Sequence, residues 1–269
     1  MLSGGDAAFR VSVDVVALTV LDDRLSVLVS RRAEPPYQGR WGLPGCDLVH
    51  DEDLDATARR ALRERTGRAT SSARIEQLAT YGAPRRDPRR PTVSVAWLAV
   101  LPVVAEPGGG RAWQPAERLL VSGRLAFDHG RLLADGVERA RAKLEYSNIA
   151  TAFLEPEFTI AALRGIYEVV WGHRLDAGNF HRKVTRTDGF VEPTGRRRQI
   201  GRGRPAELFR AGAEESLHPP LTRRSLEQAS VDPGSPVRRH PASGPGTGWS
   251  AGRDVGSSSA GPSSTSPVS

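Results

Sequence analysis

Basic side chains gather between Arg174 and Arg210. The simplest interpretation is that this segment binds an anionic polymer. About ten basic residues stand there against about four acidic ones, so the charge is clustered. Phe180 and Val184, four residues apart, predict a short helix that Asp176 caps. The other faces of that helix carry side chains of the kinds that read bases or contact phosphates in a major groove. These candidate DNA-binding residues are Asn179, His181, Arg182, Lys183 and Arg186.

A Gly-rich and Arg-rich segment follows this helix. Glycines let a backbone approach DNA closely, and arginines enter a narrow A·T minor groove, as in the AT-hook core that residues 202–205 resemble. Its candidate DNA-binding residues are Arg196, Arg197, Arg198, Arg202 and Arg204. The order helix, turn, helix and two-stranded ribbon from Phe158 to Phe209 is typical of a winged helix-turn-helix. A solvated basic face in an arginine-rich chain is the alternative explanation.

A second group of residues combines a Gly-containing loop with a charged helix. The stretch Arg40-Trp41-Gly42-Leu43-Pro44-Gly45 precedes Glu52, and Arg60, Glu64 and Gly67 lie on and after the helix. The pattern resembles the Nudix box, whose helix bears an Arg-Glu-x-x-Glu-Glu cluster that holds magnesium against a nucleoside diphosphate. The resemblance implies a set of effector-binding residues. These are Arg40, Trp41, Glu52, Arg60 and Glu64.

The box departs from this pattern at Cys46, Ala61 and Arg65. Positions 61, 64 and 65 share one helix face, where three carboxylates can converge on a metal, but only Glu64 is acidic here. An arginine in that group repels a divalent cation. We therefore expect no catalytic residue, no metal site, no required cofactor and no hydrolysis at a useful rate. Residual Mg²⁺ binding would rest on Glu64 with Glu52.

The sequence around the box predicts strands that alternate with helices, and this order indicates an α/β domain that positions the box. Residues 11–20 and 25–31 are aliphatic runs separated by Asp22-Asp23, as in a hairpin, and residues 91–101 predict a third strand. Apolar spacing predicts helices from Leu54 to a stop at Gly67, and over 128–145 and 158–171, with Thr159 as a cap and Gly172 as an end. The expected fold is a Nudix-like α/β/α sandwich with a mixed sheet, followed by an α+β winged helix-turn-helix domain and a disordered tail.

Composition divides the chain into three predicted parts: a sensor domain over 1–146, a DNA-binding domain over 147–212 and a disordered tail over 213–269. From about residue 230 more than half of the residues are Gly, Pro or Ser, which bury too little apolar surface to order a chain. The single cysteine excludes an internal disulfide and favours the cytoplasm. No apolar stretch is long enough for a membrane span, and the first twenty residues do not read as a signal peptide.

The net charge of +7 and pI near 10.4 favour an anionic partner, but the basic residues are almost all arginine. A GC-rich genome explains that excess about as well. The position of the arginines distinguishes an anionic partner from genome composition, because only clustered arginines create a positive surface that can bind an anionic partner.

The Nudix-like box and the basic winged-helix segment together resemble the Nudix-related transcriptional regulator (NrtR) family over about residues 11–210. The resemblance rests on an ordered series of short motifs. These are Arg31-Arg32-Ala-Glu-Pro-Pro, Ala126-Phe127-Asp128-His129, Lys143-Leu144-Glu145-Tyr146, Phe158-Thr159, residues 179–184, Glu192-Pro193-Thr194-Gly195 and Gly203-Arg204-Pro205-Ala206. It implies a homodimeric regulator of NAD-related genes, usually a repressor, that binds a double-stranded DNA operator and senses ADP-ribose or a similar nucleotide. The helix over 128–146 is then the expected transmitter between the domains.

Two other functions stay open from the sequence. One is an active Nudix hydrolase of a nucleoside diphosphate derivative with a basic nucleic-acid-binding appendage. The other is a nonspecific nucleic-acid-binding protein, whose affinity would depend steeply on salt but not on base sequence.

Overall fold

The computed structural model describes residues 9–66, 73–102, 108–199 and 204–227. These residues belong to one compact unit, Met1–Ser230. Within the described ranges, none of the helices combines the length and the apolar character that a membrane span requires.

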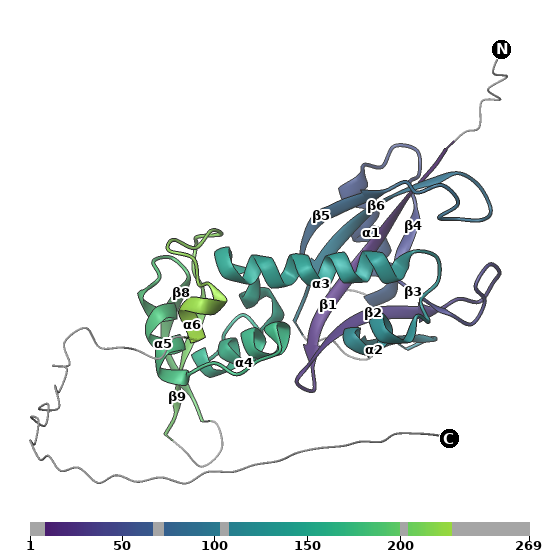
Figure 1. Cartoon of the computed structure of the whole chain (residues 1–269). Helices are drawn as coiled ribbons and strands as arrows, with labels where there is room; N and C mark the ends of the chain where they lie inside the picture. The colour runs from purple at the N-terminus through teal and green to yellow at the C-terminus, as the bar shows by residue number, and fades with distance from the viewer. Residues whose placement is uncertain (1–8, 67–72, 103–107, 200–203, 228–269) are drawn as a thin grey trace, which may run out of the picture. The chain divides into compact units, whose positions relative to one another are not determined.

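A mixed seven-stranded sheet organises the first part of the chain (Figure 1). Its strands are β1 (Arg10–Leu21), β2 (Arg24–Arg31), β3 (Trp41–Gly42), β4 (Gly45–Asp47), β5 (Arg74–Tyr81), β6 (Thr92–Val100) and β7 (Arg111–Pro115). The main order is β3-β2-β1-β6-β5, with β4 paired to β1 and β7 to β2. β1 runs parallel to β6 and antiparallel to β2, and positive φ angles at Asp22 and Asp23 (49° and 55°) close the hairpin. The predicted hairpin is confirmed.

Helices cover both faces of this sheet. Alternate residues of β1 separate the two layers, as expected for a strand buried on both sides. Val15 and Ala17 belong to the cluster that contains the buried face of α1 (Leu54–Thr66). Val16 and Leu18 belong to the cluster of α2 (Ala116–Ser122) and α3 (His129–Tyr146). The expected α/β/α sandwich is confirmed.

The second part contains the elements of a winged helix. These are the 3₁₀ helix η2 (Asn148–Phe153), α4 (Ile160–Trp171), α5 (Ala177–Arg186), β8 (Val191–Arg198) and β9 (Ala206–Ala211). The Thr159 hydroxyl accepts a hydrogen bond from the Ala162 amide at 3.1 Å and so caps α4, while Gly172 ends that helix at φ 80°. Asp176 caps α5 in the same way, accepting from the Asn179 amide at 2.7 Å. The predicted caps of both helices are confirmed.

A segment predicted to be disordered is folded. Residues 213–227, which we call the strap, end in the short helix α6 (Arg223–Glu227). Leu217, Leu221 and Leu226 are buried in the apolar core. The amide of Leu217 donates to the Tyr146 carbonyl at 2.9 Å, and the amide of Leu221 donates to the Glu145 carbonyl at 2.7 Å. The predicted start of the tail at residue 213 is therefore wrong, and the rest of that tail, residues 228–269, lies outside the described residues.

Candidate effector pocket and nucleic-acid interface

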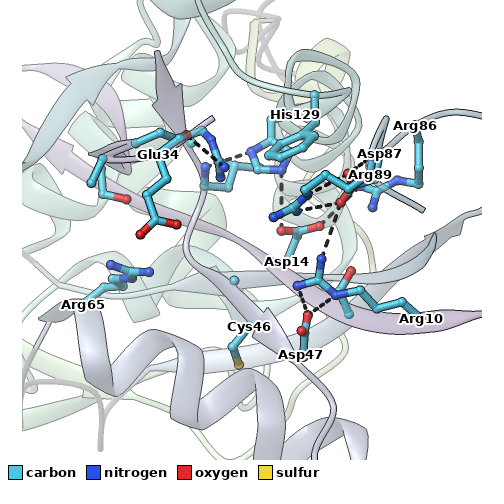
Figure 2. A pocket seen from close by; sticks show the side chains of 18 of the residues that line it. Arg10, Asp14, Glu34, Cys46, Asp47, Arg65, Arg86, Asp87, Arg89 and His129 are labelled. Carbon is cyan, nitrogen blue, oxygen red and sulfur yellow. Dashed lines mark hydrogen bonds and ion pairs between the residues drawn. The ribbon is translucent and has the colours of Figure 1, made fainter. Parts of the chain in front are cut away.

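A cavity of about 350 Å³ opens beside β1, β2 and β4, next to the first residue of α3 (Figure 2). Charged side chains dominate its wall. The arginines are Arg10, Arg31, Arg32, Arg65, Arg86 and Arg89, and the carboxylates are Asp14, Glu34, Asp47 and Asp87. Such a cavity suits a polar, anionic ligand better than an apolar one.

Asp14 lies at the base of this cavity, in the middle of an apolar strand. Its carboxylate is buried and accepts a hydrogen bond from the Ser94 hydroxyl at 2.6 Å. Arg86, from the loop after β5, approaches Asp14 at 3.4 Å and pairs with Asp128 at 2.7 Å. The burial of Asp14 and Arg86 is tolerated because each charge has an oppositely charged or hydrogen-bonding partner. The network ties the floor of the cavity to the start of α3.

His129, the first residue of α3, completes this floor in its neutral form. The Leu43 amide donates to its Nδ1 at 2.9 Å, so the ring proton resides on Nε2, which lies 3.5 Å from an Asp14 oxygen. Burial lowers the pKa of His129 below its usual value, and this outweighs the opposing influence of Asp14. The ring therefore acts near pH 7 as a neutral structural link between the Gly-Leu-Pro-Gly loop and β1.

Acidification should destabilise the protein through His129. The unfolded histidine binds a proton near pH 6.5 while the folded one resists, so stability is retained above that pH and is lost as the pH falls below it. We expect His129 to contribute a loss of up to about 1 kcal/mol in the free energy of unfolding between pH 6.5 and 5.5. Urea denaturation at both pH values should show this loss reduced in His129→Gln and retained in His50→Gln, whose side chain is 95 % exposed. The same change in the free energy of unfolding between the two pH values in all three proteins would contradict the role given to His129.

The arginines of the cavity fall into two groups. Arg10, Arg86 and Arg89 pair with aspartates, Arg89 with Asp87 at 2.7 Å for example. The other three, in the part of the chain that the structure describes, form no ion pair with a carboxylate. Arg31 donates to the Gly39 carbonyl at 2.6 Å and Arg32 to the Pro36 carbonyl at 2.8 Å, while Arg65 has a buried Nε with no hydrogen-bond partner. Three guanidinium groups that lack a carboxylate partner at one cavity are suited to bind an anion.

The residues predicted from the Nudix box form a cluster next to this cavity but do not line it. Arg60 on α1 binds Glu52 at 2.8 Å and Glu64 at 3.5 Å, and its hydrogen bonds lower the pKa of Glu52. Arg60 also donates to the main-chain carbonyl of Asp47 at 3.0 Å. The cluster therefore supports a strand that forms the cavity wall.

The remaining two predicted effector residues are also absent from the wall. Arg40 is exposed and lies over Tyr37, and Trp41 lies beneath the Arg31 guanidinium at 3.9 Å. None of the five predicted effector-binding side chains is therefore among the residues that line the described cavity. Glu52 and Glu64 contact Arg60, Arg40 lies over Tyr37, and Trp41 lies under Arg31.

Sequence reasoning missed most of the side chains that do line the cavity. One signal was present: Asp14 interrupts an otherwise apolar strand, where a charge must have a partner. The partner, Arg86, is 72 residues away and is brought there by the parallel pairing of β1 with β6. Arg31 and Arg32 contributed to the family resemblance, but their role in the cavity depends on the fold.

These residues do not supply the ligands that a magnesium ion in a Nudix site requires. Ala61 is buried and offers no oxygen, and Glu64 and Glu52 both contact Arg60. Across the described segments, no three His, Cys, Asp or Glu side chains are grouped so that they could hold a metal ion. Magnesium prefers several oxygen ligands in an octahedral arrangement, and this site supplies too few.

The second candidate surface lies on α5. His181 and Arg186 are exposed there, and Arg182 is partly buried with one N–H donated to the Asn179 side chain at 2.9 Å. Asn179 itself is only 1 % exposed and donates to the Leu226 carbonyl at 2.9 Å. In this structure the amide of Asn179 is therefore not available to a base, and the predicted base contact would require Asn179 to leave the carbonyl of Leu226.

Lys183 is also engaged by the strap. Its ammonium donates to the Ser225 carbonyl, and burial together with Arg182 lowers its pKa. The predicted phosphate contact of Lys183 would require it to leave this carbonyl. The exposed basic side of α5 is thus narrower than the sequence suggested.

The β8–β9 hairpin carries the predicted wing arginines. Arg196, Arg197 and Arg198 are exposed at the end of β8, and Arg204 is exposed before β9. Arg196 pairs with Glu157, whereas Arg197 and Arg198 form no ion pair among the described residues. Arg202 lies outside the described residues. The described end of β8 therefore presents exposed positive charge, with Glu207 opposite Arg197 in the strand register.

Two family models match the sequence. The NUDIX domain matches residues 8–136, and the NrtR DNA-binding winged helix domain matches residues 150–211. The chain is 33 % identical over 211 residues to the ADPR responsive transcriptional repressor NtrR of Acinetobacter baylyi, across 76 % of this chain and 82 % of that protein. It is 27 % identical over 118 residues to an ADP-ribose pyrophosphatase of Methanocaldococcus jannaschii, across 43 % of this chain and 68 % of that protein.

A solved structure shows the same arrangement of elements. The crystal structure of Shewanella oneidensis NrtR complexed with a 27mer DNA matches with a TM-score of 0.70 and 31 % identity, across 79 % of this chain and 99 % of that chain. The match therefore extends over the Nudix-like part and the winged helix together.

Proposed function

Because this chain belongs to the NrtR family, we propose that it is a DNA-binding transcriptional repressor that responds to ADP-ribose. The observation that carries the proposal is the presence, in one compact unit, of a basic hairpin and an arginine-lined cavity. The relative from Acinetobacter is a repressor responsive to ADPR, and the Shewanella protein binds DNA.

The DNA-binding half of the proposal rests on exposed charge. α5 offers His181, Arg182 and Arg186 to a major groove, and the hairpin offers Arg197 and Arg198 to phosphates or a minor groove. Phosphate contacts position the protein, while side chains on α5 carry the sequence preference.

The response to a nucleotide passes through α3. Its first residue, His129, lines the cavity, and its last turns bond to α4. The Arg141 guanidinium donates to the Val170 carbonyl at 3.0 Å, and the Trp171 indole donates to the Arg141 carbonyl at 3.1 Å. A shift of α3 on ligand binding moves α4 and thereby α5. A coupling free energy of about 1–3 kcal/mol would change DNA affinity by about 5- to 150-fold.

Three further parts of the proposal concern the biological setting. The protein acts as a homodimer, whose two wings contact successive half-sites of a double-stranded operator. It acts in the cytoplasm, where the DNA is accessible. Its target genes belong to NAD-related metabolism, the chemistry that produces and consumes ADP-ribose.

An active Nudix hydrolase is the second candidate, favoured by the likeness to an ADP-ribose pyrophosphatase. Of the acidic residues that Nudix hydrolysis uses, only Glu52 and Glu64 remain here, and both form ion pairs with Arg60. Magnesium-dependent turnover of ADP-ribose, abolished by Glu64→Gln, would support the hydrolase instead.

A mobility-shift assay tests the proposed function. The full chain is titrated against the DNA upstream of its own coding sequence and against unrelated DNA of equal length, with and without saturating ADP-ribose. Preferential binding to the upstream DNA and release by ADP-ribose is the expected result. Equal binding to both DNAs would indicate a nonspecific nucleic-acid-binding protein, and binding that ADP-ribose leaves unchanged would contradict the sensing role.

A further inference from the structure

We infer that Arg65 replaces the divalent cation of a Nudix site, so that the cavity binds the diphosphate of its nucleotide without a metal ion. This inference deepens the proposed function and rests on it. It concerns the chemistry that recognises the ligand, and it assigns a ligand-binding role to a residue that the Nudix pattern would count only as a lost carboxylate.

The first step is that three of the four carboxylates in the cavity wall are already paired with arginines. Asp14 and Asp87 each face an arginine, and Asp47 pairs with Arg10. Glu34 is exposed to solvent, which screens its charge. A divalent cation would therefore find one carboxylate without an arginine partner, Glu34, and would gain further ligands only by displacing arginines from their ion pairs.

The second step is the position of Arg65. It follows Glu64 on α1, and its side chain lines the cavity rather than the outer surface of the helix (Figure 2). Its Nε is buried and has no hydrogen-bond partner among the described residues. A buried donor that lacks a partner is costly unless a ligand satisfies it. The guanidinium thus brings a positive charge to the place where a metal ligand stands in the Nudix pattern.

The third step is the match in charge. Arg31 and Arg32 also line the cavity, and in the described chain neither forms an ion pair with a carboxylate. A diphosphate that links two sugars carries two negative charges. Planar guanidinium groups bind phosphate oxygens in pairs, and they remain charged at any physiological pH. Arg65 together with Arg31 and Arg32 can neutralise the diphosphate without magnesium.

Isothermal titration calorimetry of the full chain tests this inference, with ADP-ribose and ADP as separate probes in EDTA and in MgCl₂. The wild-type protein should bind a diphosphate in EDTA, with a Kd that magnesium changes by less than about twofold. Arg65→Gln should weaken binding by about 10-fold or more in EDTA. Arg63→Gln is the matched control, because Arg63 is exposed on the same helix and does not line the cavity. Its Kd should remain that of the wild type.

A second variant reverses the replacement. Arg65→Glu places a second carboxylate beside Glu64 while leaving the buried Ala61 unchanged, and binding by this variant should become dependent on magnesium. Circular dichroism and the Tm of each variant show whether it is folded.

The outcomes separate this inference from the proposed function. Wild-type binding that requires magnesium, unchanged binding by Arg65→Gln, or no binding of either diphosphate in EDTA would overturn the role of Arg65. Binding of ADP but not of ADP-ribose, lost in Arg65→Gln, would support the role of Arg65 and overturn ADP-ribose as the effector. Metal-free, Arg65-dependent binding of ADP-ribose that fails to release DNA would support the inference and overturn the regulatory proposal.

Discussion

Replacing Arg197 and Arg198 together by glutamine should weaken binding to the upstream DNA by about 100-fold near physiological salt. Both side chains are exposed at the tip of β8, and neither has a carboxylate partner within the described ranges. Their charge is therefore available to DNA without first breaking an ion pair. Arg196 differs, because its pair with Glu157 must open before it contributes.

Salt dependence gives this prediction a second, independent measurement. Each lost phosphate contact should lower the slope of log K against log salt by about 0.9, so the double variant should lose about 2 units of slope. Fluorescence anisotropy over a series of salt concentrations measures both the affinity and the slope.

The control carries the same change in net charge on a remote surface. Arg63→Gln with Arg118→Gln removes two exposed arginines from α1 and α2, and its DNA affinity should stay within about threefold of the wild type. A large loss in the control would mean that overall charge, rather than the hairpin, drives binding. Unchanged affinity in the Arg197 and Arg198 variant would remove the wing from the interface.

Local signals in the sequence were sufficient for the elements of the winged helix. Thr159 and Asp176 cap their helices because a short oxygen-bearing side chain satisfies the first free amides, and Gly172 adopts the positive φ that ends α4. The hairpin of β1 and β2 was equally visible, since two aliphatic runs flank Asp22 and Asp23. Each of these features depends on residues only a few positions apart.

The cavity could not be predicted in the same way. Its floor joins Asp14 to Arg86 and its rim holds Arg65, and these residues come from three distant elements. The Nudix pattern pointed to Glu52, Arg60 and Glu64, which do assemble, but as an ion-pair cluster that supports the wall. A motif gives the spacing of side chains along a helix, whereas the direction in which they point depends on their partners.

The burial of Asn179 could not be predicted for a related reason. On an isolated helix its amide is free to read adenine, and its type favours that role. Here the carbonyls at the end of the strap accept its N–H groups, so a long-range contact determines whether the amide is accessible. The strap itself escaped prediction because Pro219 and Pro220 interrupt the helical spacing of Leu217 and Leu221, and Leu226 follows five residues later, outside that spacing.

The strap provides the second large expected effect. Leu221→Ala should lower the free energy of unfolding by about 2–4 kcal/mol, and the Tm by about 6–10 °C. Leu221 is only 3 % exposed and belongs to the same apolar cluster as Val184 and Trp171, so truncation leaves a cavity at the junction of α5 with the strap. Denaturant titration and calorimetry measure the two quantities.

Two controls separate folding of the strap from a general effect of truncating leucines or the tail. Leu120→Ala removes a leucine that is 38 % exposed on α2 and should cost less than about 1 kcal/mol. Deleting residues 231–269 should leave the Tm unchanged, since their composition predicts little apolar burial. A Leu221→Ala variant as stable as the wild type would mean that the strap does not contribute to the core. Because Leu226 and Ser225 of the same segment hold Asn179 and Lys183, loss of the strap should also change which side chains α5 presents to DNA.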